Sequence, residues 1–248
     1  AIQQSAFEAK SYEKVVVDFE SKIPAPAQVL AAVRINPLQV ENYAGDPLLE
    51  PYIKDWSKKE TARVTSTIQQ GFSRGQTNQQ IVTTIRGTKA NNFRDGALDI
   101  TNRGAKSLVR TAVQHTATQA RLVTMEANSD LVKGYNIVVT FDAATTNQCM
   151  SIGNLNETYQ FGKGPVPPLH RGCRDSITAA LSQKFDFLDE GAKRASKGAS
   201  GGKPVDAKLA SYDWLKTQPK AFQDTAIGPT RGKLLRNGGL SSEEFARL

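Results

Sequence analysis

Apolar residues recur at intervals of three and four over much of the chain, which is the pattern of amphipathic helices. The longest stretches of this kind cover residues 1–22, 51–71 and 102–128. A shorter helix is expected after Thr77, which has the side chain of a helix N-cap. Prolines and glycines separate these stretches, so we expect several distinct helices.

One segment alternates between apolar and polar residues, as a half-buried strand does. Its alternate positions Tyr135, Ile137, Val139 and Phe141 would share one face. Residues 158–161 are expected to pair back on this strand as a hairpin, after a turn at residues 153–156. The sequence therefore predicts an α+β fold, mostly helical, with a small antiparallel β-hairpin core around residues 135–174.

The same patterns suggest a division into four parts. Residues 1–59 are expected to form an N-terminal segment of helices and loops, and residues 60–190 a core domain of helices plus the hairpin, in which residues 176–190 return to helix. Residues 191–204 are rich in Gly, Ser and Lys and are expected to be a flexible linker. Residues 205–248 are expected to be a helical tail, whose last helix is capped by Ser241.

The chain has a formal net charge of +8, and the excess is unevenly distributed. Residues 61–130 hold 9 basic and 4 acidic residues, and residues 191–248 hold 11 and 5. This bias is typical of a protein that contacts a polyanion, although a basic protein that is merely soluble fits equally well. No run of about 18 apolar residues occurs, so no membrane-spanning helix and no membrane contact are expected.

Four basic residues lie along the predicted helix at 102–128 and are candidates for contact with nucleic acid. They are Arg103, Lys106, Arg110 and Arg121. Lys and Arg neutralise phosphates without reading a base sequence, so any such contact would be non-specific. The alternative is that these residues form an ordinary solvated helix face.

Both cysteines and one of the two histidines fall within a single stretch, residues 142–175. Cys149, His170 and Cys173 could ligate zinc, but a structural zinc site uses four ligands, and the remaining candidate, Asp142, offers oxygen. A disulfide between the cysteines, a cysteine nucleophile paired with His170, and simple burial are the alternatives. No phosphate-binding loop, zinc-protease helix or nucleophile elbow occurs. We therefore expect no catalytic residues, no cofactor and no enzyme activity.

This stretch resembles the phage Mu F-like minor head proteins, also called phage head morphogenesis proteins. The resemblance rests on Asp142, Thr145, Cys149, the turn at Gly153-Asn154, Phe161, Pro168, His170, Cys173 and Arg174. Two flanking regions agree, namely residues 109–112 and the tail motifs within residues 212–240. The resemblance covers about residues 60–248. Some members carry a second cysteine three residues before the first and so have four ligands, whereas this chain has Thr146 there.

The resemblance implies a structural role, in which Asp142, Thr145, Cys149, His170, Cys173 and Arg174 form a structural motif. Such proteins lie inside the head of a tailed phage, near the portal, and take part in head assembly. The expected partners are the portal protein, other capsid proteins and double-stranded DNA, and some members are thought to be ejected with that DNA. The expected location is the capsid interior, with the host cytoplasm during assembly. The alternatives are an enzyme or toxin-like effector that uses the cysteine–histidine cluster, or a DNA-binding assembly factor outside the virion.

Overall fold

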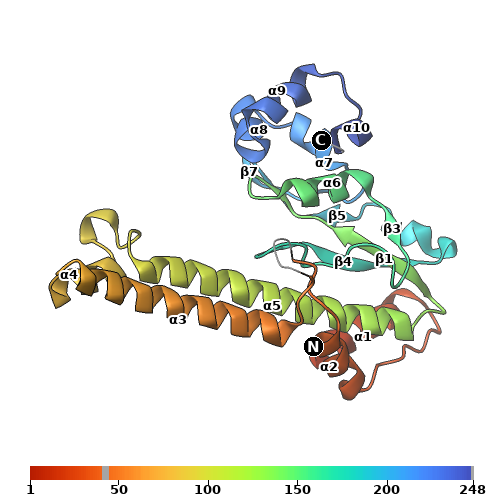
Figure 1. Cartoon of the computed structure of the whole chain (residues 1–248). Coiled ribbons are helices and arrows are strands. Elements are labelled where there is room, and N and C mark those ends of the chain that lie inside the picture. Colours follow the sequence, from red (N-terminus) through yellow and green to blue (C-terminus); the bar gives the residue numbers. More distant parts are fainter. Residues whose placement is uncertain (41–44, 247–248) are drawn as a thin grey trace.

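The computed structural model describes residues 1–40 and 45–246 (Figure 1). Its helices are α1 (Ile2–Val15), α2 (Pro26–Ile35), α3 (Leu49–Ser73), α4 (Asn78–Arg86), the 3₁₀-helix η1 (Lys89–Asn91), α5 (Ala97–Ala127), α6 (Asn147–Leu155), the 3₁₀-helix η2 (Gln183–Asp189), α7 (Ser211–Lys216), α8 (Lys220–Ile227), α9 (Pro229–Asn237) and α10 (Ser242–Ala246). Its strands are β1 (Val132–Val138), β2 (Phe141–Asp142), β3 (Thr158–Tyr159), β4 (Ser176–Leu181), β5 (Lys193–Arg194), β6 (Ser196–Gly198), β7 (Gly201–Gly202) and β8 (Val205–Asp206). The predicted α+β class with a mostly helical chain is confirmed.

The expected hairpin of β1 and β3 is present, but a third strand, β4, pairs with the other side of β1, so that the strand order is β3-β1-β4. β1 pairs with β3 through Tyr135 and Tyr159, as predicted. Its longer partner is β4, in a register that sets Ile137 opposite Ile177. The prediction of helix for residues 176–190 was therefore wrong over β4, while η2 follows it. The small residues of β4 have no strong local preference, and pairing with β1 decides their conformation.

The connection between β1 and β3 also differs from the prediction of a simple turn. Gly153 and Asn154 lie inside helix α6. The Thr146 side chain caps this helix by accepting a hydrogen bond from Cys149 N at 3.4 Å. Gly153 is buried against the ring of Phe141, where a Cβ would lie 2.8 Å from a ring carbon. Close packing of the helix on Phe141 therefore requires glycine at this position.

The segment expected to be a flexible linker contains three strands. β6 pairs in parallel with β2 and antiparallel with β7, and β5 pairs with β8. Arg194 is only 5% exposed: its guanidinium lies over the Phe141 ring and donates to Asn156 Oδ1 at 2.7 Å. The Gly and Ser residues form the tight turn between β6 and β7, where Gly201 has φ +104°, a conformation that favours glycine. The domain boundaries as a whole stay a prediction.

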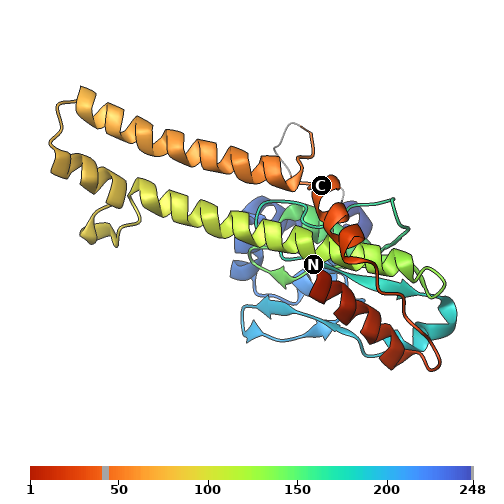
Figure 2. The same ribbon diagram turned by 90° about the horizontal axis from the view of Figure 1, so that it is seen from below.

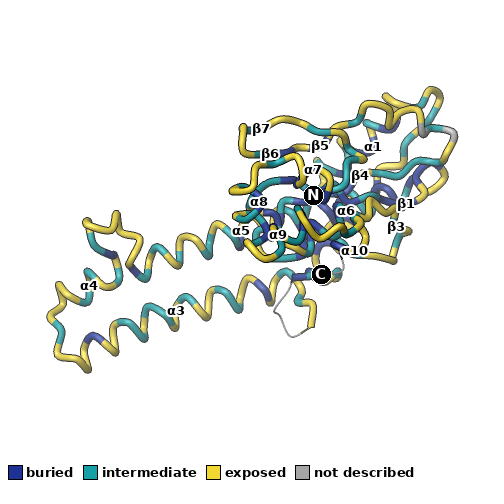
Figure 3. The backbone as a smooth tube through the Cα atoms, turned by 90° about the horizontal axis from the view of Figure 1, so that it is seen from above, coloured by how far each residue is buried: buried dark blue, intermediate teal, exposed yellow. Residues whose placement is uncertain are grey.

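Helix α5 is the longest element and links two different parts of the molecule. Its C-terminal part packs against α1, α2 and the sheet. Its N-terminal part pairs with α3, and together with α4 these helices form an arm that extends away from the globular body (Figure 2). Buried residues gather in the body, whereas the arm is mostly exposed or half-buried (Figure 3).

The C-terminal helices fix α6 in place. Trp214 of α7 packs on Phe141, with the ring centroids 5.3 Å apart. The Ser211 hydroxyl donates to the Met150 carbonyl at 2.5 Å, and Tyr212 N donates to Asn154 Oδ1 at 2.6 Å. The predicted Ser241 cap is confirmed, because its hydroxyl accepts from Glu244 N at 3.2 Å. Within the described residues, no helix is long and apolar enough to cross a membrane.

Candidate functional site

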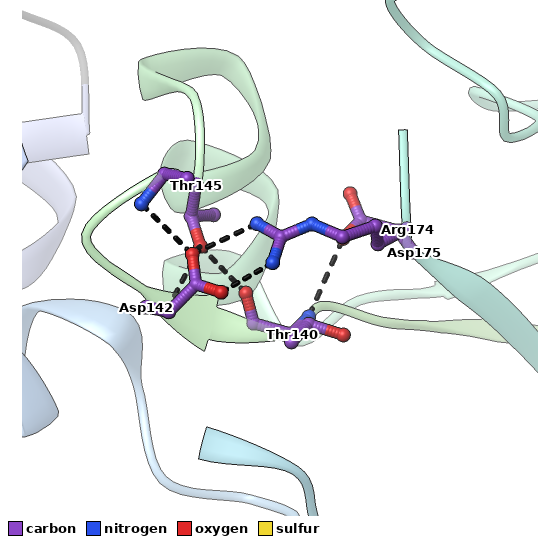
Figure 4. A network of polar contacts seen from close by, with 6 residues as sticks. Thr140, Asp142, Thr145, Arg174 and Asp175 are labelled. Carbon is purple, nitrogen blue, oxygen red and sulfur yellow. Dashed lines mark hydrogen bonds and ion pairs between the residues drawn. The ribbon is translucent and has the colours of Figure 1, made fainter. Parts of the chain in front are cut away.

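Asp142 and Arg174 form the centre of a polar network at the end of β2 (Figure 4). Arg174 Nη2 donates to Asp142 Oδ1 at 2.8 Å, and Nη1 forms a second ion-pair contact with Oδ2. Both side chains are largely buried, with 33% of Arg174 and 15% of Asp142 exposed. The Arg174 hydrogen bonds hold the pKa of the Asp142 carboxyl below its usual range, and the carboxylate raises the pKa of Arg174 in turn.

Thr145 closes the turn that follows β2. Its hydroxyl donates to the Thr140 carbonyl at 2.6 Å and accepts a hydrogen bond from Asp142 N at 3.0 Å. Ala144 N donates to Asp142 Oδ1 at 2.8 Å, which completes an Asx-type turn. Asp142 therefore contacts two other predicted motif residues, Thr145 and Arg174, although Arg174 comes from a distant part of the chain.

Asp175 belongs to the same network and was not singled out from the sequence. It is buried, accepts a hydrogen bond from Thr140 N at 3.3 Å, and lies 3.6 Å from Cys173 Sγ. Burial raises the pKa of its carboxyl to about 6, and the nearby Cys173 adds to that shift. Its position directly after the motif arginine was the only sequence signal, and that signal carries no information about burial.

The structure brings Cys149, His170 and Cys173 together beside this network. Their ligand atoms all lie within 4.8 Å of one another. Cys149 lies in the first turn of α6, while His170 and Cys173 lie in the loop before β4. Both cysteines are buried and free, and His170 is half-buried.

Hydrogen bonding within this cluster distinguishes the two thiols. A hydrogen bond from the Cys149 thiol, together with one from His170, lowers the pKa of Cys173 to about 3 against the opposing effect of burial. The same contact with Cys173, then burial and the charge of Asp175, raise the pKa of Cys149. The hydrogen bond with Cys173 also raises the pKa of His170. Cys173 is therefore the more acidic of the two thiols.

The ligand atoms are of the types that zinc prefers, but the described residues supply three of them, whereas a structural zinc site uses four. Two sulfurs and one imidazole are typical zinc ligands. His170 Nδ1 lies 3.2 Å from the Arg171 carbonyl, which can only accept, so the other ring nitrogen is left for the sulfurs. Asp142, the fourth ligand considered from the sequence, is instead occupied by Arg174 and lies outside the three-residue group. The idea of Asp142 as a ligand was therefore wrong.

Neither cysteine is accessible to a substrate in this structure. A catalytic cysteine must reach its substrate, and thiolate character without exposure leaves it inert. Cys173 has no exposed surface and Cys149 only 1%. The two thiols therefore face the interior, and the cluster joins the first turn of α6 to the loop before β4.

Next to the cluster lies a basic pocket of about 420 Å³ between α5 and the loop at residues 170–174. Three of the four basic residues predicted from the sequence line it, namely Arg103, Lys106 and Arg110. His170, Arg171 and Arg174 line the facing wall. The sequence did not predict this wall as basic, although the run from His170 to Arg174 contains the signal.

The fourth basic residue, Arg121, lies elsewhere. Its Nη1 donates to the Ile177 carbonyl at 2.7 Å, and its Nε lies 3.4 Å from a Glu8 carboxylate oxygen. These contacts tie α5 to β4 and α1. Arg121 therefore does not line the pocket with the other three basic residues, and a nucleic-acid contact by Arg121 stays a prediction.

Comparison with protein-family models, curated proteins and solved structures finds no match to this chain.

Proposed function

We propose that this chain is a structural minor head protein of a tailed phage, located inside the capsid near the portal. In this role it aids head assembly, binds the portal and other capsid proteins, and contacts packaged DNA without sequence preference. The proposal follows the resemblance to phage Mu F-like proteins and does not assign an enzyme activity to the chain. Ejection with the DNA, as thought for some members, belongs to the same proposal.

The observation that supports this proposal best is the way in which the motif residues contact each other. Asp142 is hydrogen-bonded to both Thr145 and Arg174, and Cys149 and Cys173 are buried beside them. A motif whose side chains are consumed by internal contacts stabilises a fold and leaves little to act on a substrate. Internal contacts of this kind are consistent with a structural role for the chain.

The distribution of charge and shape gives further support. The basic excess of residues 61–130 falls on the arm and on the face of α5 that lines the basic pocket. A polyanion such as encapsidated DNA is a suitable partner for such a surface. An arm that extends from a packed body is also suited to bind between neighbouring subunits of an assembly.

Quantitative mass spectrometry of purified particles of the phage that encodes the chain tests this proposal. The expected result is a low-copy component that remains after a high-salt wash and nuclease treatment, with the portal protein as internal reference. A chain that accumulates in the lysate but is missing from the particles would contradict the proposal. It would favour an assembly factor outside the virion.

The proposal includes no bound cofactor, and zinc at Cys149, His170 and Cys173 is the alternative. Structural zinc has four protein ligands as a rule. Elemental analysis of protein purified without added metal is expected to give a zinc content far below one ion per chain. A content of about one ion per chain, lost in Cys149→Ser, would replace this view with a structural zinc site.

A further inference from the structure

We propose that the basic pocket between α5 and the loop at residues 170–174 is a binding site for the phosphodiester backbone of DNA. The choice of DNA rests on the proposed function, whereas the choice of a phosphate ligand rests on the pocket itself. Among the residues that the structure describes, five cationic side chains line it and no acidic residue does. They are Arg103, Lys106, Arg110, Arg171 and Arg174.

Two of these cations are paired with a carboxylate, and the other three are unpaired within the described residues. Arg174 is paired with Asp142, and Arg103 is paired with Asp99 at 2.8 Å. Within the described part of the chain, the side chains of Lys106, Arg110 and Arg171 take part in no ion pair or hydrogen bond. Uncompensated like charges held close together repel one another, and a bound anion removes that cost.

The two walls of the pocket are fixed relative to each other. Arg103, Lys106 and Arg110 are spaced three and four residues apart, so they share one face of α5. Gly172 N donates to the Thr111 hydroxyl of α5 at 2.8 Å and so ties the loop to the helix. Gly172 has φ +75°, a conformation that glycine adopts at no cost. The site is thus formed before its ligand arrives, which lowers the entropic cost of binding.

The end of a helix adds to the positive potential. Ala144 and Thr146 line the pocket immediately before α6, so the N-terminus of α6 opens toward it. That end of a helix carries a positive partial charge and favours anions. The unpaired cations supply full positive charges at the pocket, and the N-terminus of α6 adds a smaller partial charge.

Exposure of the cations favours a polymer over a small phosphate compound. A site for a small ligand buries most of the ligand and lines it with mostly apolar groups. Here Lys106, Arg110 and Arg171 are all exposed. Exposed Lys and Arg on an open face are typical of contacts with a nucleic-acid backbone, where affinity comes from the release of counterions.

The experiment compares two triple variants that remove the same charge. The pocket variant is Lys106→Ala, Arg110→Ala and Arg171→Ala. The control variant is Lys10→Ala, Lys14→Ala and Lys220→Ala, at exposed positions outside the pocket. Circular dichroism and thermal unfolding verify that both fold as the parent does. Binding to a fluorescein-labelled, random-sequence duplex is then measured by anisotropy over a series of salt concentrations.

The pocket variant is expected to bind at least about tenfold more weakly at low salt, and its slope of log K against log salt should be smaller by about 2 to 3. The control variant should keep the parent slope within about 1. Equal losses in the two variants, or an unchanged slope in the pocket variant, would overturn the proposal. Displacement of the duplex by millimolar inorganic phosphate, at constant ionic strength, would assign the pocket to a small anion instead.

These outcomes separate the site from the proposed function. A chain that is present in particles but whose two variants bind DNA equally keeps its role as a head protein and loses this site. A chain that is absent from particles but has a defective pocket variant keeps the site and loses the role.

Discussion

Asp142 and Arg174 lie 32 residues apart in the sequence and yet form a two-contact ion pair. The ion pair joins the end of β2 to the segment that leads into β4. Because both groups are largely withdrawn from water, loss of one partner leaves the other charged, buried and unsatisfied. The pair is therefore worth more to stability than the surface ion pairs of the arm.

Replacing Asp142 by Asn should destabilise the protein by about 2 kcal/mol, because a charge-assisted bond is lost and Arg174 is left without a counter-ion. The matched control is Asp99→Asn, which breaks the more exposed pair with Arg103 and should cost less than about 0.5 kcal/mol. Urea unfolding followed by circular dichroism gives both values. Equal costs for the two substitutions would show that the motif pair is not a structural element.

His115 provides a pH-dependent contribution to stability. Its ring is 1% exposed and its Nε2 donates to the Val33 carbonyl of α2 at 3.0 Å. Burial lowers the pKa of this imidazole below the ordinary value of 6.5. The unfolded chain then binds the proton more readily, so stability is complete above about pH 6.5 and declines as the pH falls below it.

The corresponding measurement is the unfolding free energy of the parent and of His115→Gln between pH 8 and pH 5, the range that brackets this titration. The difference between the two proteins should shrink as the pH falls, since the parent loses the advantage of a neutral imidazole. A difference that stays constant over this range would mean that His115 titrates alike in the folded and unfolded states.

At the scale of elements, the sequence predicted long helices well and short strands poorly. The repeats of α3 and α5 span many turns, so their periodicity is clear without knowledge of the fold. β4 and the strands between residues 193 and 202 are short and rich in Ala, Ser and Gly. Their conformation comes from partners distant in the sequence, such as β1 and β2, and no local pattern records those partners.

The candidate site was predictable in the same uneven way. The convergence of Cys149, His170 and Cys173 could be read from the sequence because rare residue types fall in one stretch. The partner of Asp142 could not be read from the sequence, because the sequence alone does not tell whether this carboxylate would ligate a metal or pair with an arginine. The separation of Arg121 from Arg110 likewise depends on which part of α5 faces the sheet.

The tip of the arm depends on one close approach of backbone to backbone. A Cβ at Gly96 would lie 2.4 Å from the Arg86 carbonyl carbon and the Gly87 nitrogen. Gly96→Ala should therefore force the end of α4 away from the start of α5. Amide hydrogen exchange is expected to become faster over residues 78–96, while the body keeps its protection.

The control for this experiment is Gly75→Ala in the same arm. Its Cβ would meet no atom within 4 Å, and only its φ of +67° costs about 1 kcal/mol. Exchange at residues 78–96 should change much less in this variant. Similar exchange in both variants would show that the contact at Gly96 does not hold the tip.

At the scale of the whole molecule, α5 connects a packed body with an extended, basic arm (Figures 1 and 2). The sequence predicts both helices of the arm, but it does not predict that they pair with each other and leave the body. Polar and apolar contacts join them: the Thr101 hydroxyl donates to Glu60 at 2.6 Å, and Tyr52 of α3 belongs to the same apolar cluster as Leu108 of α5. The basic pocket lies on the body side of this arm, where α5 meets the loop at residues 170–174.

The motif residues of this protein contact one another within the fold, and its pocket cations are proposed to contact DNA. The most direct test of the proposed function is to locate the chain in a cryo-electron microscopy map of the intact phage particle, with a particle that lacks the gene as reference. The predicted result is density for the body and arm inside the head, next to the portal, with the basic pocket toward the DNA. Complete particles with no such density, from a phage that expresses the chain, would contradict it.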